Sequence, residues 1–426
     1  MLDLKRIRTE TDRVREAIAF KKTEADLDRY LLLDEERRGL LIESERLKHE
    51  RNDVSEEIGR LKKAGKDAAD KVRAMKQAGE TIKSLDQRIA GLQGELEAIL
   101  AWIPNVPHPS VPRADDASGN VVVREAREIK EFAFEPKPHW ELAESLGLLD
   151  FERAGKIAGA GFLLFTGRGA RLERALIRFM IDLAARRGYT EVSPPHLVRR
   201  ECLFGTGQLP KLEEDMYKIQ GEELFLNPTA EVPITNIYRE EILDGRRLPI
   251  RHVGYCASYR KEAGSYGRET RGMIRVHQFD KVELVKLVRP ETSYDEHESL
   301  LADAAAVLDQ LELPHRVVLL AAGDLSFAGA KCYDLETWAP GEGRWLEVSS
   351  CTNFEDFQAR RAGIRFRPEP GAKVEYVHTL NASGLALPRT FATLLEVHQT
   401  ERGSVRLPDA LLPYWDGDRE IGPVEG

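Results

Sequence analysis

The most informative segment of the chain is a pair of charged stretches joined by a glycine-rich connection at residues 263–272. The first stretch reads Tyr259-Arg260-Lys261-Glu262, and the second reads Met273-Ile274-Arg275-Val276-His277-Gln278-Phe279-Asp280-Lys281-Val282-Glu283-Leu284-Val285. This pattern is typical of a β-hairpin with a long polar loop. Alternation along the second strand predicts that Val276 and Gln278 share one face, and that His277, Phe279, Lys281 and Glu283 share the other.

Two interpretations of this hairpin stay open from its residues alone. A buried aromatic ring beside carboxylates and an arginine suits a purine-phosphate ligand, which would place Phe279 and Arg260 in a binding site. Alternatively, the hairpin is an exposed charged surface with Phe279 in the core.

The residues around the hairpin, 113–426, alternate short β-branched or aromatic stretches with turns and a few helices. Amphipathic patterns predict helices over residues 172–187 and 300–311. Because the regular spacing of βαβ units is absent, we expect an α+β fold in which helices flank an antiparallel sheet.

The N-terminal hundred residues have the strongest periodicity in the chain. Leucine or valine recurs every seven residues at Leu33, Leu40, Leu47, Val54 and Leu61, and a second series continues through Val72, Met75, Ile82, Leu85, Ile89, Leu92, Leu96 and Ile99. The patterns predict two helices of about 35 residues, each about 50 Å long, joined by a turn at 64–68. Such an antiparallel coiled-coil arm is either a dimerisation or spacer element, or an arm that grips an extended partner.

A basic cluster lies around the turn between these two helices. Residues 60–76 have seven Lys or Arg against two Asp, which makes the cluster a candidate phosphate-contacting surface.

A proline-rich stretch marks a domain boundary. Four prolines between Pro104 and Pro112 end the helical region and predict a stiff connector. We therefore expect an N-terminal domain at 1–103 with a hairpin at about 27–100, a linker at 104–120 and a catalytic domain at 121–426.

Composition excludes several classes of protein. The chain has 63 Lys and Arg against 72 Asp and Glu, and no stretch of 18 apolar residues, so neither a membrane nor DNA is an expected partner. The N-terminus lacks the apolar stretch of a signal peptide, and the four cysteines are widely spaced, so we expect a cytoplasmic protein without zinc. Phosphate-loop, dinucleotide-fold and nucleophile-elbow motifs are absent. An enzyme of this sequence would take its nucleophile from a substrate.

Three segments together resemble the bacterial seryl-tRNA synthetases, a class II aminoacyl-tRNA synthetase family. They are Tyr259–Val285, the run Glu347–Arg361 with its Glu-Val-Ser-Ser-Cys start, and the run His378–Thr390 that contains Asn381-Ala382-Ser383-Gly384 and Arg389. The helical arm, the proline-rich connector, Asn227-Pro228-Thr229-Ala230-Glu231 and residues 188–198 are also similar to that family. The resemblance implies a class II catalytic domain and a homodimer. It also implies ATP-dependent charging of serine tRNA, and of selenocysteine tRNA where one exists, with Mg²⁺ as cofactor.

The resemblance also implies roles for individual residues. The catalytic residues would be Arg260, Glu262 and Arg389; serine would be bound by Thr229, Ala230, Glu231, Arg260, Glu283, Asn381 and Ser383; ATP would be bound by Arg260, Lys261, Glu262, Val276, Phe279, Glu347, Val348, Ser349, Ser350 and Arg389. Glu347 and Ser350 would hold magnesium, since a carboxylate and a hydroxyl suit a hard cation. In the family the arm reaches the long variable arm of serine tRNA.

Two alternatives to this function remain open. A paralogue with the same adenylation chemistry would charge another acceptor or confer antibiotic resistance. A non-enzymatic RNA-binding descendant of a synthetase is the other alternative, although Arg260, Glu262 and Arg389 are all present. One departure from the family pattern is Pro388, which stands where a glycine is common and predicts a changed turn before Arg389.

Overall fold

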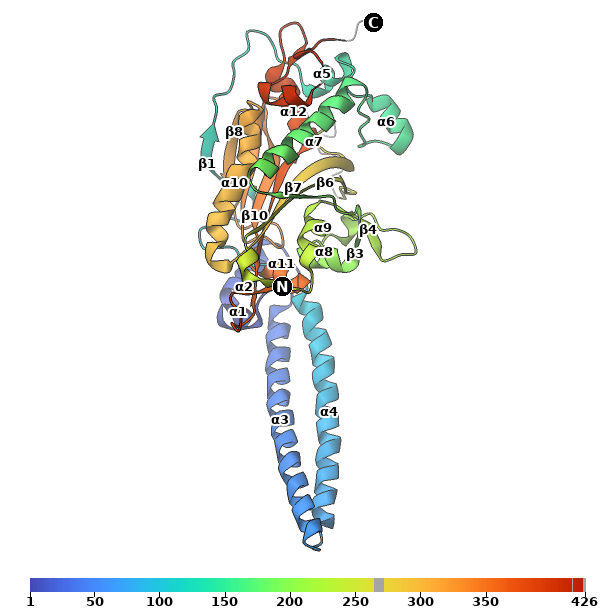
Figure 1. Cartoon of the computed structure of the whole chain (residues 1–426), viewed down its shortest axis with the longest axis vertical. Coiled ribbons are helices and arrows are strands. Elements are labelled where there is room, and N and C mark those ends of the chain that lie inside the picture. Colours follow the sequence, from blue (N-terminus) through green and yellow to red (C-terminus); the bar gives the residue numbers. More distant parts are fainter. Residues whose placement is uncertain (264–271, 416, 424–426) are drawn as a thin grey trace. The chain divides into compact units, whose positions relative to one another are not determined.

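The computed structural model describes residues 1–263, 272–415 and 417–423. The chain forms two compact units, Leu2–Ile103 and the body from Pro104 to Gly426, which also includes Met1. In Figure 1 the chain is coloured along the sequence, so each unit can be found by its residue numbers. Within the described ranges, no helix has the length and apolar character needed to cross a membrane.

The N-terminal unit is entirely helical. It contains α1 (Leu4–Thr9), α2 (Thr11–Phe20), α3 (Leu27–Lys63) and α4 (Ala69–Leu100). The carboxylate of Asp26 caps α3 by accepting from the amide of Arg29 at 2.9 Å. The reversal between α3 and α4 includes Gly65 at φ +67°, a conformation that favours glycine. The predicted pair of helices with a turn at 64–68 is therefore confirmed.

Apolar side chains from both predicted series pack between α3 and α4. Leu33, Leu92 and Leu96 are buried, and cross-hairpin ion pairs such as Arg88 to Glu36 at 2.7 Å flank this seam. The extension of the second series back to Val72 is wrong, because that side chain is 39% exposed. It lies one turn from the tip, where the seam ends.

The body is built on an eight-stranded sheet. In spatial order its strands are β1 (Val121–Ala126), β8 (His315–Leu319), β9 (Lys331–Ala339), β10 (Arg344–Asn353), β13 (His378–Ala386), β7 (Gln278–Val288), β6 (Ile250–Tyr259) and β2 (Thr190–Val192). Every pairing is antiparallel except the edge pair of β2 with β6, which is parallel. The predicted α+β fold is thus confirmed, and the parallel edge pairing of this sheet is a feature that the sequence did not predict.

Three long helices cover the sheet (Figure 1). They are α7 (Arg168–Arg186), α10 (Ser293–Gln310) and α12 (Leu387–His398), and they contribute Leu176, Leu300 and Phe391 to the main apolar core. The first two correspond to the helices predicted from amphipathic patterns. Pro388 falls in the first turn of α12, where a missing amide donor costs nothing. Pro388 is therefore compatible with a regular helix that begins just before Arg389.

The remaining elements are short. The helices are α5 (His139–Ser145), α6 (Phe151–Ala158), α8 (Arg200–Thr206), α9 (Glu231–Thr235) and α11 (Phe357–Ala362). The strands are β3 (Leu197–Arg199) with β4 (Leu224–Leu226), β5 (Ile242–Asp244) with β11 (Arg365–Arg367) and β12 (Glu375–Tyr376), and β14 (Val405–Arg406) with β15 (Glu420–Ile421).

The charged hairpin is formed by β6 and β7, which pair from Ile250 with Leu287 to Tyr259 with Gln278. The predicted alternation of side chains between the two faces of the second strand holds only from Gln278 onward. Val276 lines the same cavity as Phe279, whereas His277 does not line it and its ring lies near Phe162. The prediction that Val276 and Phe279 face opposite ways is wrong, because β7 begins after Val276 and strand alternation does not apply to the preceding residues.

Candidate active site

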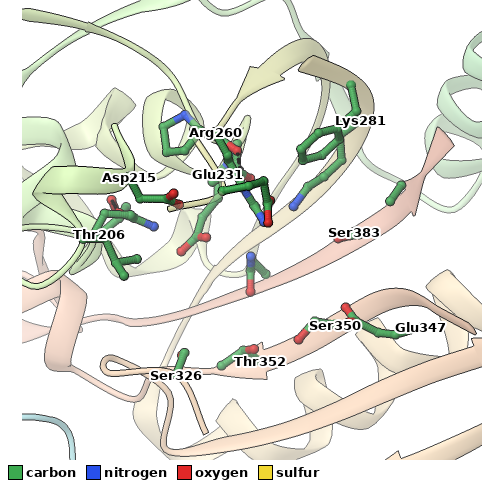
Figure 2. A pocket seen from close by; sticks show the side chains of 18 of the residues that line it. Thr206, Asp215, Glu231, Arg260, Lys281, Ser326, Glu347, Ser350, Thr352 and Ser383 are labelled. Carbon is green, nitrogen blue, oxygen red and sulfur yellow. Dashed lines mark hydrogen bonds between the residues drawn. The ribbon is translucent and has the colours of Figure 1, made fainter. Parts of the chain in front are cut away.

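A cavity of about 460 Å³ opens above the centre of the sheet. Figure 2 shows Glu347, Ser350 and Thr352 along β10, Ser383 on β13, and Glu231, Arg260 and Asp215 across the cavity from them. Most of the predicted site residues line it: Thr229, Glu231, Arg260, Glu262, Val276, Phe279, Glu347, Val348, Ser350, Asn381, Ser383 and Arg389. Residues that are far apart in sequence therefore meet at one place.

Four predicted residues lie outside the described lining of this cavity: Ala230, Lys261, Glu283 and Ser349. Glu283 is directly behind the lining and contacts it by hydrogen bonds. Ser349 is buried and donates to the backbone oxygen of Ser383 at 2.6 Å. The amide of Lys261 donates to the oxygen of Asp215, and its Nζ lies 5.9 Å from the centre of the Tyr217 ring.

Arg260 follows directly after β6 and is held from two sides. Its Nε donates to the oxygen of Pro228 at 3.2 Å, and its guanidinium carbon lies 5.2 Å from the centre of the Phe279 ring. The amide of Tyr259 also donates to the oxygen of Asn227 at 3.0 Å, which ties the end of β6 to the Asn227–Glu231 segment. The guanidinium of Arg260 is therefore held in position at the lining of the cavity.

A buried acidic pocket lies beside this arginine. The carboxylate of Glu283 is fully buried and accepts from Thr229 Oγ1 at 3.1 Å and from Asn381 Nδ2 at 3.0 Å. Lys281 Nζ lies 2.6 Å from Glu283 Oε2. Burial raises the pKa of Glu283, and the charge of Lys281 opposes that rise.

Glu231 is the second carboxylate of this pocket and begins α9. Burial, followed by the nearby charge of Glu283, raises the pKa of Glu231 to about 7. Its Oε1 accepts from Gln358 Nε2 at 2.7 Å, and Gln358 Oε1 in turn accepts from Thr379 Oγ1 at 2.7 Å. This relay fixes the orientation of the Gln358 amide and thereby the position of the Glu231 carboxylate.

The opposite end of the cavity combines a cation, an acid and a hydroxyl. Arg389 Nη1 lies 3.1 Å from Glu347 Oε2, and Arg389 Nε donates to the oxygen of Ile274 at 3.3 Å. Ser350 Oγ lies 3.0 Å from Cys332 Sγ.

A bulge in β10 brings the acid and the hydroxyl to one face. The register with β9 shifts between Glu347 and Ser349, so Val348 is an extra residue. In a strand without this bulge, residues 347 and 350 are three positions apart and would point to opposite faces. Their shared orientation offers two oxygen donors on one side, and the Glu347 side chain is 44% exposed, which fits a hydrated divalent cation.

Glu262 and Val276 flank the aromatic side of the cavity together with Phe279. Glu262 Oε2 lies 3.1 Å from Arg275 Nη1, and its φ of +51° is in the left-handed region that non-glycine residues seldom adopt. Such a conformation persists where surrounding contacts hold it, which is typical of functional sites.

Several residues that line the cavity or contact its lining were not predicted from the sequence. Lys281 lines the cavity and pairs with Glu283, and its spacing of two residues from Glu283 on one strand already indicated a shared face. Gln358, Asp215 and Met273 gave no such signal, because only the tertiary fold brings them to the site.

Family models and known proteins match this chain. A model of the tRNA synthetase class II core domain (G, H, P, S and T) matches residues 214–398, and one of the seryl-tRNA synthetase N-terminal domain matches residues 1–107. The serine--tRNA ligase of Caldanaerobacter subterraneus subsp. tengcongensis is 55% identical over 98% of this chain and 99% of its own length. That of Geobacillus kaustophilus is 54% identical over 99% and 100%.

A solved structure shares the whole fold. Seryl-tRNA synthetase from Pyrococcus horikoshii, complexed with ATP, has a TM-score of 0.94 and 39% identity, and the match covers 100% of both chains. Because relatives with more than half of their residues identical match over almost the full length of both partners, the chain belongs to the seryl-tRNA synthetase (serine--tRNA ligase) family.

Proposed function

We propose that this chain activates L-serine with ATP and transfers the seryl group to the 3′ end of serine tRNA, and of selenocysteine tRNA where one exists. The observation that carries the proposal is the meeting, around one cavity, of the acidic pocket of Glu283 and Glu231 with the guanidinium groups of Arg260 and Arg389. The acids suit an amino acid with an ammonium and a hydroxyl, and the guanidinium groups suit carboxylate and phosphate.

In the first step an oxygen of the serine carboxylate attacks the α-phosphorus of ATP. The bond from this phosphorus to the bridging oxygen of the β-phosphate breaks, and pyrophosphate leaves with its electron pair. Arg260 aligns the two anions and stabilises the charge that develops between them. Arg389 binds the far end of ATP.

The adenosine part of ATP would lie on the aromatic side of the cavity. Glu262 would accept from the adenine amino group, Phe279 would stack on the base and Val276 would pack beside it. The other residues that we assign to ATP are Lys261, Glu347, Val348, Ser349 and Ser350.

Serine would occupy the acidic pocket. Glu283 and Ser383 would bind its hydroxyl, and Thr229 and Glu231 would bind its ammonium, with Ala230 and Asn381 completing the pocket. An alanine in this pocket would leave buried polar groups without a partner, so the site selects against amino acids that lack the hydroxyl.

In the second step a hydroxyl of the terminal ribose of the tRNA attacks the carbonyl carbon of the adenylate, and AMP leaves. Both nucleophiles belong to substrates. The protein therefore acts by positioning and by electrostatic stabilisation rather than through a covalent intermediate.

Glu347 and Ser350 would hold magnesium, because the β10 bulge turns a carboxylate and a hydroxyl toward one side of the cavity. Magnesium bound there supplies positive charge that neutralises the phosphates and orients them. Arg389, which contacts Glu347, would keep that carboxylate directed toward the phosphates.

The partners follow from the N-terminal unit and the family. We assign residues 1–103 to tRNA binding, residues 104–120 to a linker and residues 121–426 to catalysis. The exposed basic cluster around Lys62, Lys63 and Lys66 would contribute phosphate contacts. We also propose that the chain works as a homodimer in the cytoplasm.

The test is amino-acid-dependent exchange of pyrophosphate into ATP with serine, threonine, alanine and glycine, followed by transfer to total tRNA in the same reaction. Exchange with serine alone, followed by transfer, is the expected result. Serine exchange without transfer would instead support a paralogue with another acceptor or an antibiotic-resistance role. Absence of exchange would overturn the adenylation chemistry and favour a non-enzymatic RNA-binding protein.

A further inference from the structure

A buried cluster of three titratable side chains lies behind the nucleotide end of the cavity and has no role in the chemistry above. His139 begins α5, Glu342 lies in the turn between β9 and β10, and Glu396 lies near the end of α12. His139 and Glu396 have fully buried side chains and Glu342 has one that is 7% exposed. We refer to these three residues as the brace.

Glu396 joins the segments by its two carboxylate oxygens. Oε1 accepts from the amide of His139 at 2.8 Å and lies 2.8 Å from the imidazole Nδ1. Oε2 accepts from the amides of Gly341 at 2.8 Å and Glu342 at 3.3 Å. A buried carboxylate with this many N–H donors is well satisfied, so α5, α12 and the β9–β10 turn are fixed together.

The second ring nitrogen of His139 faces a different segment. The amide of Met273 donates to His139 Nε2 at 3.2 Å. Close packing supports this contact, because a Cβ placed on Gly272 would lie 2.2 Å from Nε2, and Gly272 has φ +77°. The segment that returns from the glycine-rich connection to β7 therefore rests directly on the imidazole.

The hydrogen bond from Met273 also determines the tautomer. Nε2 needs a free electron pair to accept it, so the proton of the neutral ring is on Nδ1 and points to the two carboxylates. Although His139, Glu342 and Glu396 have the residue types of a metal site and their ligand atoms lie within 4.8 Å of one another, a metal at Nδ1 would force the proton onto Nε2, against the Met273 amide. The geometry favours a hydrogen-bonded brace over a metal centre.

Three of the segments that the brace contacts continue into the nucleotide end of the cavity. Met273 itself lines the cavity and precedes Ile274, whose oxygen accepts from Arg389. Glu396 is two helical turns from Arg389 on α12, and Glu342 is five residues before Glu347. One buried histidine thus links the three segments that carry Ile274, Glu347 and Arg389.

We propose that His139 is a positioning residue for ATP, acting through the Met273 amide, with Glu342 and Glu396 fixing its ring. The inference rests on the proposed function, since ATP is the ligand positioned. It assigns a role in nucleotide affinity to a residue that does not line the cavity in the described part of the chain.

Two substitutions separate the contacts of the imidazole. His139→Asn places an amide N–H near the position of Nδ1, so it retains a donor for the carboxylates and loses the acceptor for Met273. His139→Gln places an amide oxygen near the position of Nε2, so it retains that acceptor and weakens the carboxylate side. A positioning role predicts that these variants differ in ATP binding.

The experiment measures KM for ATP and for serine in serine-dependent pyrophosphate exchange, together with the thermal midpoint. We expect His139→Asn to raise KM for ATP about tenfold with KM for serine unchanged, and His139→Gln to restore KM for ATP to within about threefold of the parent. Gly272→Ala, which crowds the same contact from the other side, should raise KM for ATP as His139→Asn does. His315→Asn is the control, because His315 is a buried histidine on β8 whose Nδ1 contacts only a backbone oxygen, that of Leu313, among its described hydrogen bonds.

Three results would overturn the inference: a parental KM for ATP in both His139→Asn and Gly272→Ala, equal losses in His139→Asn and His139→Gln, or stoichiometric zinc in the parent that is lost in the His139 variants. A parent that shows no serine-dependent exchange would instead overturn the proposed function. The two failures are therefore distinguishable.

Discussion

Arg389 Nη1 lies 3.1 Å from Glu347 Oε2 and 2.8 Å from the backbone oxygen of Glu347. The cation and the anion that we assign to the phosphate end of ATP thus contact each other. The pair links the start of α12 to the bulged strand β10, so the two groups are held in register. A substitution of either partner should therefore change nucleotide chemistry more than it changes stability, because the two side chains are partly exposed, Arg389 to 29% and Glu347 to 44%.

Arg389→Ala should suppress adenylate formation. Removing a preorganised cation from developing phosphate charge costs about 10²-fold to 10³-fold in rate. The measurement is serine-dependent pyrophosphate exchange, with circular dichroism to verify that the helical arm is folded. Arg389→Lys retains the charge but loses the planar fork of the guanidinium, so its exchange rate should lie between that of the parent and that of Arg389→Ala. If purified Arg389→Ala exchanged pyrophosphate at the parental rate, the role assigned to Arg389 would be wrong.

Serine binding should weaken as the pH falls below 7. The pKa of Glu231 is raised to about 7 by burial and by the charge of Glu283, so this carboxyl is protonated in acid and no longer attracts the serine ammonium. Binding of serine below pH 7 should then release a proton from Glu231. Calorimetry of serine binding in buffers of different ionisation enthalpy measures that proton directly.

The same shift predicts how Glu231 affects stability. Its pKa in the folded chain lies above the ordinary value near 4.5, so the folded state binds more protons between pH 4.5 and 7. The contribution of Glu231 to the free energy of unfolding is thus greatest in acid and declines as the pH rises through about 7. Glu231→Gln should remove both this pH dependence and the proton release. A parental proton release in that variant would exclude Glu231 as its source.

The arm was predictable because its signal is local. The seven-residue repeat from Leu33 and the gap at 64–68 specify two helices without reference to the rest of the chain. The exposed Val72 was mispredicted because periodicity does not tell where a seam stops near a tip. In the body, two charged stretches joined by a glycine-rich connection predicted the β6–β7 hairpin. The parallel edge pairing of β2 was not predicted, because it depends on contacts between distant segments.

The candidate site was predictable mainly through its resemblance to a family. The residue types of Arg260 and Phe279 indicated a purine-phosphate ligand, whereas the roles of Glu283 and Arg389 came from the resemblance alone. The orientation of Ser350 depends on the bulge at Val348, and bulges leave no clear mark in a single sequence. The contact of Met273 with His139 joins residues 134 positions apart, and no local pattern predicts it.

Lys281→Met should weaken serine recognition. Lys281 Nζ lies 2.6 Å from the fully buried carboxylate of Glu283, and its loss leaves a buried acid without its cation. Glu283 should then take up a proton and accept more weakly from the serine hydroxyl, because it is no longer an anion. We expect kcat/KM for serine to fall about a hundredfold, with KM for ATP nearly unchanged.

A matched control for this change is Lys286→Met on the same strand. Lys286 is also buried and pairs with Glu296 at 2.9 Å, but it does not line the described cavity. The Lys286→Met substitution should lower the thermal midpoint of unfolding, while KM for serine stays at the parental value. Equal effects of the two substitutions on KM for serine would show that Lys281 acts through general stability rather than through Glu283.

Shortening the arm should separate serine activation from tRNA charging. The variant deletes residues 31–98 and joins Tyr30 to Ile99 through the natural turn sequence of residues 64–68. Because α3 and α4 belong to a different compact unit from the cavity, serine-dependent pyrophosphate exchange should stay within about twofold of the parent. Transfer to serine tRNA should fall at least about a hundredfold, since RNA duplexes are recognised largely through backbone contacts that the arm would supply. Parental charging by the shortened chain would remove the arm from the mechanism, whereas loss of exchange would show that the arm also supports the catalytic unit.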